Sequence, residues 1–217
     1  MKIKVCGMKD PENMLEIAEL PIDMIGMIFY EKSPRCVDEQ DADRINELQL
    51  EIPKAGVFVN ASLEFVMNKV KRFGLQFVQL HGNESPDFCC TLRKKGIQVI
   101  KSFQINTTED LISCLIYEDS CDYFLFDTPT SLYGGSGNKF DWEILSAYTG
   151  TTPFFLSGGI EPEDAKIINQ LNFPQLAAVD LNSRFETSPG IKDIVKIHMF
   201  IKAYHPALVA GSPEKDY

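Results

Sequence analysis

Short apolar runs and segments of helical periodicity alternate along the whole chain. Eight of the runs are dominated by aliphatic and aromatic side chains, which is typical of strands buried on both faces. These predicted strands lie at residues 3–6, 24–30, 55–60, 77–80, 98–105, 123–127, 154–157 and 177–181.

The segments between the predicted strands carry signals of helix starts. Proline stands at the first helical position in Asp10-Pro11, Ser85-Pro86 and Glu161-Pro162, where its missing N–H would be unpaired in any helix. Thr107 and Asp110 have the spacing of a capping box. Asp141 is the predicted cap of a short helix that follows the sixth strand, and the last helix is predicted from about residue 192 to residue 203.

Eight strand–helix units predict an α/β fold, the (β/α)8 TIM barrel. A doubly wound open sheet is the alternative architecture for such alternation, but the count of eight favours the barrel. We expect a single barrel domain over residues 1–204. Residues 205–217 lack periodicity and contain two prolines, so they are predicted to form a flexible tail.

Composition narrows the function classes. The 217 residues carry a net charge of −10, which argues against nucleic acid or an acidic membrane as a partner. Residues 1–6 lack the apolar segment of a signal peptide, and no apolar run approaches membrane-spanning length. The six cysteines are irregularly spaced, which favours free thiols in a cytoplasmic protein. Because there is no Cys-x-x-Cys pair and the three histidines are scattered, no metal site is predicted.

Polar residues collect where the predicted strands end. In a TIM barrel the carboxyl ends of the strands form one rim, and the active site lies at this rim. The residues at or just beyond these ends are Cys6, Arg35, Gln79, His81, Asp127, Ser157, Gly158, Gly159 and Asp180. The barrel hypothesis therefore places them around one site.

Two glycine-containing segments are candidate anion sites. The loop of residues 134–137, Gly-Gly-Ser-Gly, follows Asp127, and Ser157-Gly158-Gly159 ends the seventh strand. Bare backbone N–H groups in such loops bind phosphate, particularly after strands 7 and 8 of a barrel, where Asn182-Ser183 also lies. The alternative for both segments is a tight turn without a ligand.

Cys6, Asp127 and Arg35 are also open to two interpretations. An apolar strand usually buries cysteine as a small core residue, but at the rim a thiol whose pKa is lowered by nearby positive charge is a candidate base. Aspartate at a strand end is commonly a turn residue, or else a proton donor. Arg35 is either solvated or a fork for a carboxylate.

Taken together, the motifs resemble one family, phosphoribosylanthranilate isomerase, over residues 4 to about 204. The matching segments are Lys4-Val5-Cys6-Gly7, Ser33-Pro34-Arg35, residues 56–60 (GVFVN), residues 78–82 (VQLHG), Phe126-Asp127-Thr128, residues 134–137 with Phe140-Asp141-Trp142, residues 156–159 (LSGG), and Pro189-Gly190 with Lys192-Asp193. Each motif is weak alone, whereas their order and spacing together are specific.

The resemblance implies a barrel enzyme of tryptophan biosynthesis without metal or organic cofactor. Its reaction is the Amadori rearrangement of N-(5-phospho-β-D-ribosyl)anthranilate, a phosphosugar, to 1-(2-carboxyphenylamino)-1-deoxy-D-ribulose 5-phosphate. By motif matching, Cys6 is the general base and Asp127 the general acid. Asp127 then needs a raised pKa. Phe124 and Phe126 on its own strand fit an apolar setting, although one of each alternating pair of side chains points away.

The same matching implies the binding residues. Arg35 would hold the anthranilate carboxylate, and Asp180 the sugar hydroxyls. The residues implied around the phosphate are Gly135, Ser136, Gly137, Gly158, Gly159, Asn182 and Ser183. Arg184 departs from the family, which usually has glycine there, and it would either add charge beside the phosphate or turn to solvent.

Two other functions remain open at this stage. One is the parallel sugar isomerisation of histidine biosynthesis, which usually employs two carboxylates, so that Cys6 favours the tryptophan-pathway reaction. The other is a non-catalytic phosphosugar-binding barrel, which has no need of Cys6 paired with Asp127. The sequence does not distinguish a monomer from a homodimer.

Overall fold

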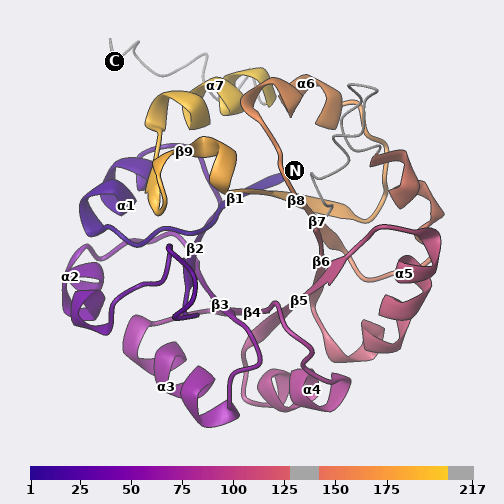
Figure 1. Ribbon diagram of the computed structural model, residues 1–217, viewed down its shortest axis with the longest axis horizontal. Helices are drawn as coiled ribbons and strands as arrows, with labels where there is room; N and C mark the ends of the chain where they lie inside the picture. Colours follow the sequence, from indigo (N-terminus) through magenta and orange to yellow (C-terminus); the bar gives the residue numbers. More distant parts are fainter. Residues whose placement is uncertain (128–141, 205–217) are drawn as a thin grey trace.

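The computed structural model describes residues 1–127 and 142–204, and in them the chain forms a closed eight-stranded barrel surrounded by helices (Figure 1). The barrel strands are β1 (Lys2–Val5), β2 (Met24–Ile28), β3 (Lys54–Phe58), β4 (Phe77–Leu80), β5 (Gln98–Gln104), β6 (Tyr123–Asp127), β7 (Phe154–Ser157) and β8 (Leu176–Leu181). Neighbouring strands are parallel, and β8 closes the barrel against β1 with Asp180 beside Lys4. The predicted TIM barrel is confirmed, and the open sheet is excluded.

Seven α-helices of the described residues cover the outside of the barrel (Figure 1). They are α1 (Pro11–Ala18), α2 (Ala42–Glu47), α3 (Leu63–Phe73), α4 (Pro86–Lys94), α5 (Thr108–Ser113), α6 (Ala165–Ile168) and α7 (Ile194–Tyr204). The capping signals act as predicted at three of them: Asp10 accepts from the N–H of Asn13, Ser85 accepts from that of Phe88, and Thr107 forms a capping box with Asp110.

The chain after β8 differs from the prediction. Residue 192 was expected to begin the last helix, but it lies in a two-stranded hairpin of β9 (Glu186–Ser188) and β10 (Ile191–Lys192), and α7 begins two residues later. The reason is Gly190, whose φ of +90° makes the tight turn between the two short strands. Figure 1 shows this hairpin beside β1 and α1 rather than among the outer helices.

Other boundaries moved by smaller amounts. Strands β2 and β3 end two residues before the predicted runs do. The helix predicted between β7 and β8 is a short 3-10 turn, Pro162–Asp164, that leads into the four-residue α6. Residues 128–141 and 205–217, which include the predicted cap Asp141 and the predicted tail, lie outside the described part of the chain.

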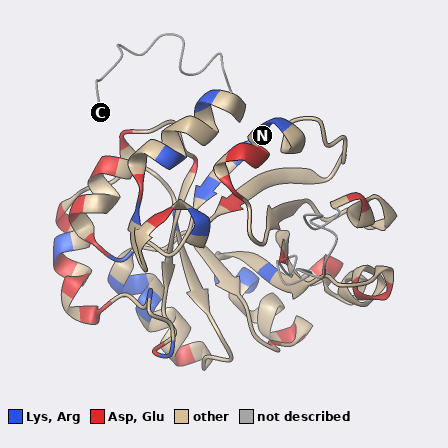
Figure 2. Ribbon diagram, turned by 45° about the horizontal axis from the view of Figure 1, so that its top comes forward, with Lys and Arg blue, Asp and Glu red and all other residues tan. Residues whose placement is uncertain are grey.

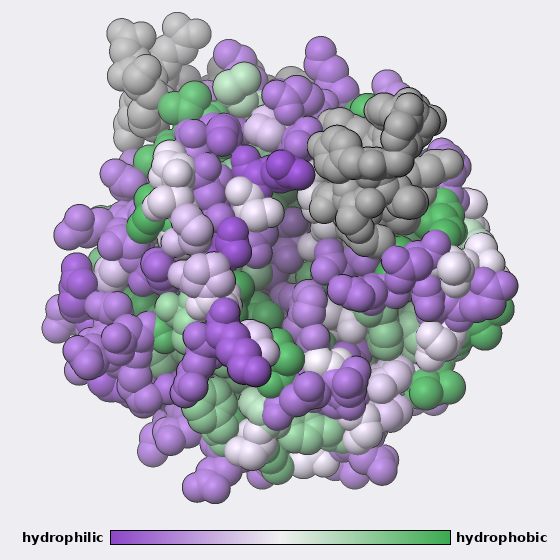
Figure 3. Space-filling model, viewed as in Figure 1, coloured by the Kyte–Doolittle hydropathy of each residue, from purple (hydrophilic) through white to green (hydrophobic). Residues whose placement is uncertain are grey.

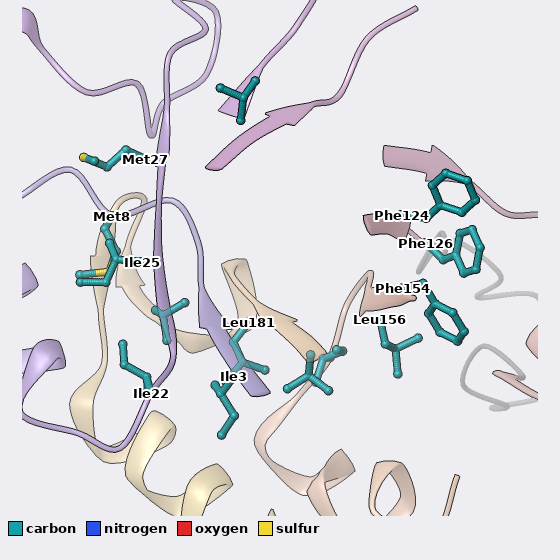
Figure 4. Packing of buried hydrophobic residues seen from close by; sticks show 14 of the residues in the cluster. Ile3, Met8, Ile22, Ile25, Met27, Phe124, Phe126, Phe154, Leu156 and Leu181 are labelled. Carbon is teal, nitrogen blue, oxygen red and sulfur yellow. The ribbon is translucent and has the colours of Figure 1, made fainter. Parts of the chain in front are cut away.

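Outward-facing side chains of the strands pack against the helices and make up the main core. Phe124, Phe126 and Phe154 gather on one side of the barrel (Figure 4), with the rings of Phe126 and Phe154 4.7 Å apart. Side chains alternate along a strand, so both phenylalanines of β6 point away from the inward-facing Asp127. The two phenylalanines therefore do not form the apolar surroundings expected for Asp127.

Inward-facing residues form two layers of different character. The lower layer is apolar and consists of Met24, Ala55, Ile100, Leu125, Phe155 and Ala178. Two residues further along three of these strands, the inward positions become Ser102, Asp127 and Asp180. The barrel thus changes from apolar to polar towards the carboxyl ends of its strands, where the site was predicted.

The helices around the barrel carry both acidic and basic residues (Figure 2), and the face seen along the barrel axis is largely hydrophilic at its centre (Figure 3). No helix of the described residues is long and apolar enough to cross a membrane. All six cysteines are free, as predicted.

Candidate active site

A buried lysine organises the interior of the barrel. Lys4 is 1% exposed, and its Nζ donates to Asp180 Oδ1 at 2.7 Å and to Gln79 Oε1 at 2.8 Å. A buried charge needs such partners, because desolvation without them costs several kcal/mol or more. The pairing with Asp180 follows directly from the register of β1 and β8.

The same lysine fixes the orientation of the Gln79 amide. An ammonium group only donates hydrogen bonds, so Gln79 presents its oxygen to Lys4 and its nitrogen to the other side. That nitrogen donates to Ser102 Oγ at 3.2 Å and lies 3.4 Å from His81 Nδ1. His81 Nδ1 is then the acceptor, and neutral His81 carries its proton on Nε2.

His81 Nε2 lies 3.7 Å from Asp127 Oδ2, at the end of β6. Burial raises the pKa of Asp127, and nearby Asp180 raises it further, while His81 opposes them. Burial also lowers the pKa of His81. In both side chains burial disfavours the charged form.

Cys6 follows β1 and is 3% exposed. Burial raises the pKa of its thiol, Asp180 raises it further, and Lys4 and Lys192 act in the opposite direction. The lowered thiol pKa expected from the sequence is thus wrong, because burial and Asp180 together outweigh the two lysines. On the neighbouring strand, a Cβ atom at Gly26 would lie only 2.7 Å from Cys6 Sγ, so this glycine leaves the space that the thiol fills.

Arg35 lies in the segment after β2 and forms a two-pronged pair with Glu186 of β9. Its Nη2 donates to Glu186 Oε2 at 2.6 Å, and its Nε donates to Oε1 at 2.8 Å. Lys192 Nζ donates to the same Oε1 at 2.6 Å. The carboxylate fork predicted at Arg35 is present, but in this structure it holds a carboxylate of the protein itself.

Lys192 also links this cluster to the end of β8. Its Nζ donates to Asn182 Oδ1 at 2.9 Å, so the amide nitrogen of Asn182 points away from this ammonium group. Gly7 lets the side chains of Asn182 and Arg35 approach the backbone closely, because a Cβ atom at this position would lie 2.6 Å from Asn182 Oδ1 and 2.8 Å from Arg35 Cδ. The segment after Cys6 is thereby packed between Arg35 and Asn182.

Of the residues predicted to bind phosphate, some lie after β7 and β8, and the others lie outside the described part of the chain. Gly158 and Gly159 follow β7 with φ angles of +97° and +58°, and Ser183 begins a short 3-10 turn, Ser183–Phe185, after β8. Arg184 Nε lies 3.6 Å from Oε1 of Glu161, a residue of the segment that follows β7. Gly135, Ser136 and Gly137 lie outside the described residues.

Three charged residues of the site were not predicted from the sequence, namely Lys4, Glu186 and Lys192. Lys4 had a usable signal, since a lysine between Ile3 and Val5 in a strand buried on both faces must have a buried partner. Lys192 stands in one of the matching motifs, but the sequence predicts it as the first residue of the last helix, and Glu186 has no signal of its own. Among the residues described, no group of three or more His, Cys, Asp or Glu side chains is arranged to hold a metal ion.

Comparison with known proteins assigns the chain to a family. The sequence model of N-(5′-phosphoribosyl)anthranilate isomerase matches residues 3–203. The N-(5′-phosphoribosyl)anthranilate isomerase of Parabacteroides distasonis is 51% identical over 216 residues, covering 97% of each chain.

Two solved structures share the fold over 94% of this chain and 98% of theirs. A phosphoribosyl anthranilate isomerase in complex with reduced 1-(o-carboxyphenylamino)-1-deoxyribulose 5-phosphate is 32% identical, with a TM-score of 0.80. A monomeric form generated from the dimeric enzyme of Thermotoga maritima is 31% identical, with a TM-score of 0.79. The chain belongs to the N-(5′-phosphoribosyl)anthranilate isomerase family.

Proposed function

We propose that this enzyme, an isomerase by its family, converts N-(5-phosphoribosyl)anthranilate to 1-(2-carboxyphenylamino)-1-deoxyribulose 5-phosphate in tryptophan biosynthesis, with Asp127 as general acid and Cys6 as general base. The observation that carries the assignment of roles is Asp127 itself. It is an inward-facing carboxyl group at the barrel rim, and its surroundings favour the protonated form. A raised pKa favours the protonated carboxyl group that a general acid requires.

The first step is ring opening. Asp127 gives its proton to the furanose ring oxygen, the bond from that oxygen to C1 breaks, and the anilino nitrogen supplies the electron pair for a C1=N bond. The product is a protonated Schiff base with a free C4 hydroxyl. His81 Nε2–H, 3.7 Å from Asp127 Oδ2, stabilises the carboxylate that remains.

The second step is removal of the C2 proton by Cys6. The electron pair of the C2–H bond forms a C1=C2 bond and neutralises the iminium nitrogen, giving an enolamine that tautomerises to the ketone. Cys6 acts as the thiolate, after its own proton has passed to solvent. Its pKa is raised in the free enzyme, and the positive charge of the Schiff base favours the thiolate. Each positioned proton transfer contributes about 10²–10⁴ in rate.

The remaining groups bind the substrate by its charges and hydroxyls. We assign the anthranilate carboxylate to Arg35 and the sugar hydroxyls to Asp180, whose Oδ1 is held by Lys4. We assign the phosphate to the backbone of Gly158 and Gly159 with Ser183 and Asn182, and to Gly135, Ser136 and Gly137. Hydrogen bonds from several N–H groups to an anion contribute about 1.5–3 kcal/mol each.

The direct test follows the fluorescence of freshly generated phosphoribosylanthranilate after the enzyme is added. We expect rapid decay with the wild-type enzyme and decay near background with Asp127→Asn, whose amide cannot protonate the ring oxygen. The absence of decay with folded wild-type protein would refute the activity. Undiminished decay with Asp127→Asn would refute only the role of the acid.

The base is tested separately with Cys6→Ala. This variant removes the proton acceptor and leaves the binding groups, so turnover should fall by about 10²-fold or more while affinity for the reduced product analogue is retained. Turnover that survives the substitution would exclude Cys6 as the base.

A further inference from the structure

The guanidinium of Arg35 has donors left over after its pair with Glu186. Glu186 takes Nε–H and one N–H of Nη2. Within residues 1–127 and 142–204, Arg35 donates no other side-chain hydrogen bond, so both N–H groups of Nη1 and the second of Nη2 stay unused. Nη1 and Nη2 together make the end-on edge of the guanidinium, which matches a second carboxylate in two-pronged geometry.

The side chain of Glu186 is buried and accepts hydrogen bonds from residues other than Arg35. Its side chain is 5% exposed, and Oε1 also accepts from Lys192 Nζ at 2.6 Å and from the N–H of Gly190 at 3.1 Å. Lys192 is fully buried at its side chain and is fixed to α1 by two hydrogen bonds between its backbone and Asn13. Displacing Glu186 would leave the buried ammonium of Lys192 without its carboxylate partner, which is costly.

The charges of the cluster favour binding of one further anion. Arg35 and Lys192 are cations and Glu186 is an anion, so the three carry one net positive charge. Glu186 therefore does not neutralise the cluster. Glu186 instead fixes the orientation of the Arg35 guanidinium, and with it the direction in which the remaining positive charge points.

We infer that Glu186 is a positioning residue, which aims the end-on edge of Arg35 at the substrate's aromatic carboxylate and so sets specificity for an ortho-carboxylated arylamine. The inference rests on the proposed function, in which Arg35 binds that carboxylate. Without Glu186, Arg35 would have to be ordered during binding, and an immobilised long side chain costs affinity. The alternative is that Glu186 merely occupies the substrate's place on Arg35, in which case its removal would improve binding.

The test compares two ligands and three variants by calorimetry. The ligands are reduced 1-(2-carboxyphenylamino)-1-deoxyribulose 5-phosphate and its phenylamino counterpart without the carboxylate. The variants are Glu186→Gln, which keeps the shape of the side chain, Arg35→Lys, and the double variant. Asp43→Asn is the matched control, because it removes the carboxylate of another two-pronged arginine pair, with Arg72, on the outer helices.

We expect the wild-type enzyme to prefer the carboxylated ligand, and Glu186→Gln to reduce this preference about tenfold. The affinity for the carboxylate-free ligand should change less than twofold, and Asp43→Asn should leave both affinities unchanged. Arg35→Lys should abolish the preference, and adding Glu186→Gln should then cause no further loss. In turnover, Glu186→Gln should raise KM about tenfold and change kcat less than threefold.

Several outcomes would overturn the inference. An unchanged or increased preference in Glu186→Gln would show that Glu186 does not aim Arg35, and equal weakening of both ligands would show a purely structural role. A wild-type enzyme that binds both ligands equally would refute the assignment of Arg35 in the proposed function, and the inference with it. Melting curves of each variant, with Glu186→Ala as a second substitution, separate lost folding from lost preference.

Discussion

Asp127 and Cys6 meet the chemical requirements of their proposed roles to different degrees. Burial and Asp180 favour the proton on Asp127, which is the state that an acid needs. The same influences favour the thiol of Cys6, whereas a base must be a thiolate. The population of the productive combination of protonation states in the free enzyme depends on how far apart the two pKa values lie.

This leads to a prediction for the pH dependence of kcat/KM. The productive form needs protonated Asp127 and ionised Cys6. When the pKa of the acid lies below that of the base, its population rises through the pKa of Asp127 and falls through that of Cys6. We expect a bell whose acidic limb lies above the pKa of an ordinary aspartate and whose alkaline limb lies above that of an ordinary thiol.

The variant His81→Gln checks the assignment of the acidic limb. His81 lowers the pKa of Asp127, so its loss should move the acidic limb to higher pH and leave the alkaline limb in place. The substrate phosphate titrates near pH 6, but it contributes equally to both profiles. An acidic limb that does not move, or that moves to lower pH, would contradict the coupling of these two residues.

Gly26→Ala tests the space around Cys6. The new Cβ would lie 2.7 Å from Cys6 Sγ, so the thiol must shift. A misplacement of about 1 Å can cost about 10²-fold in rate, and we expect kcat to fall at least tenfold while the affinity for the reduced product analogue is retained. Gly56→Ala is the contrast. Its Cβ would meet Leu75 and Phe58, so it should lower Tm without lowering kcat of the folded enzyme.

At the scale of elements, the β9–β10 hairpin is attached to α1 by one side chain. Asn13 accepts from Lys192 N–H at 2.7 Å and donates to the Lys192 carbonyl at 3.0 Å, and it is 5% exposed. Because both backbone groups of Lys192 are satisfied by this amide, α1 determines where the hairpin carries Lys192 and Glu186. The position of the cluster of Arg35, Glu186 and Lys192 thus depends on α1.

We predict that Asn13→Ala destabilises the protein and lowers its affinity for the substrate's carboxylate. An unsatisfied buried N–H or C=O group costs about 1–3 kcal/mol, which corresponds to a fall in Tm of roughly 2–10 °C for a domain of this size. The control is Asn46→Ala, which removes a bond from an exposed asparagine to the Arg72 carbonyl and should change the unfolding free energy by at most about 0.5 kcal/mol. Equal melting temperatures for the two variants would contradict the prediction.

Elements whose local sequence agrees with their environment were predictable. Residues 123–127 combine aromatic and aliphatic side chains with a terminal aspartate, and β6 has those bounds. Proline at the first helical position located the starts of α1 and α4. The hairpin was not predictable in the same way, since β9 and β10 have three and two residues, too few for any periodicity to appear.

The candidate site follows the same division. Cys6, Asp127 and Asp180 were expected at the rim because each ends or follows a clear strand. The pair of Arg35 with Glu186 joins residues 151 positions apart, and no local pattern relates them. Burial raises the pKa of Cys6, and Asp180, which the closure of the barrel brings near, raises it further.

At the scale of the whole molecule, α7 completes the cover over the junction where the barrel closes. Its Ile197, Phe200 and Ile201 are fully buried, and Tyr204 stacks on Phe200 with ring centroids 5.3 Å apart. Fully burying a large apolar side chain contributes about 1.5–3 kcal/mol. The burial of these four side chains is therefore comparable in free energy to the whole stability of a domain, which is roughly 5–15 kcal/mol.

Two truncations test the proposal that residues 1–204 are the complete folding and catalytic unit. A chain ending at Tyr204 retains every contact of α7 described above, so we expect its kcat, KM and Tm to equal those of the full chain within error. A chain ending at Asp193 lacks α7, and we expect it to lose the cooperative thermal transition, because the outer faces of β1 and β8 would be exposed. Loss of activity or a lower Tm on removal of residues 205–217 alone would place part of the functional unit beyond Tyr204.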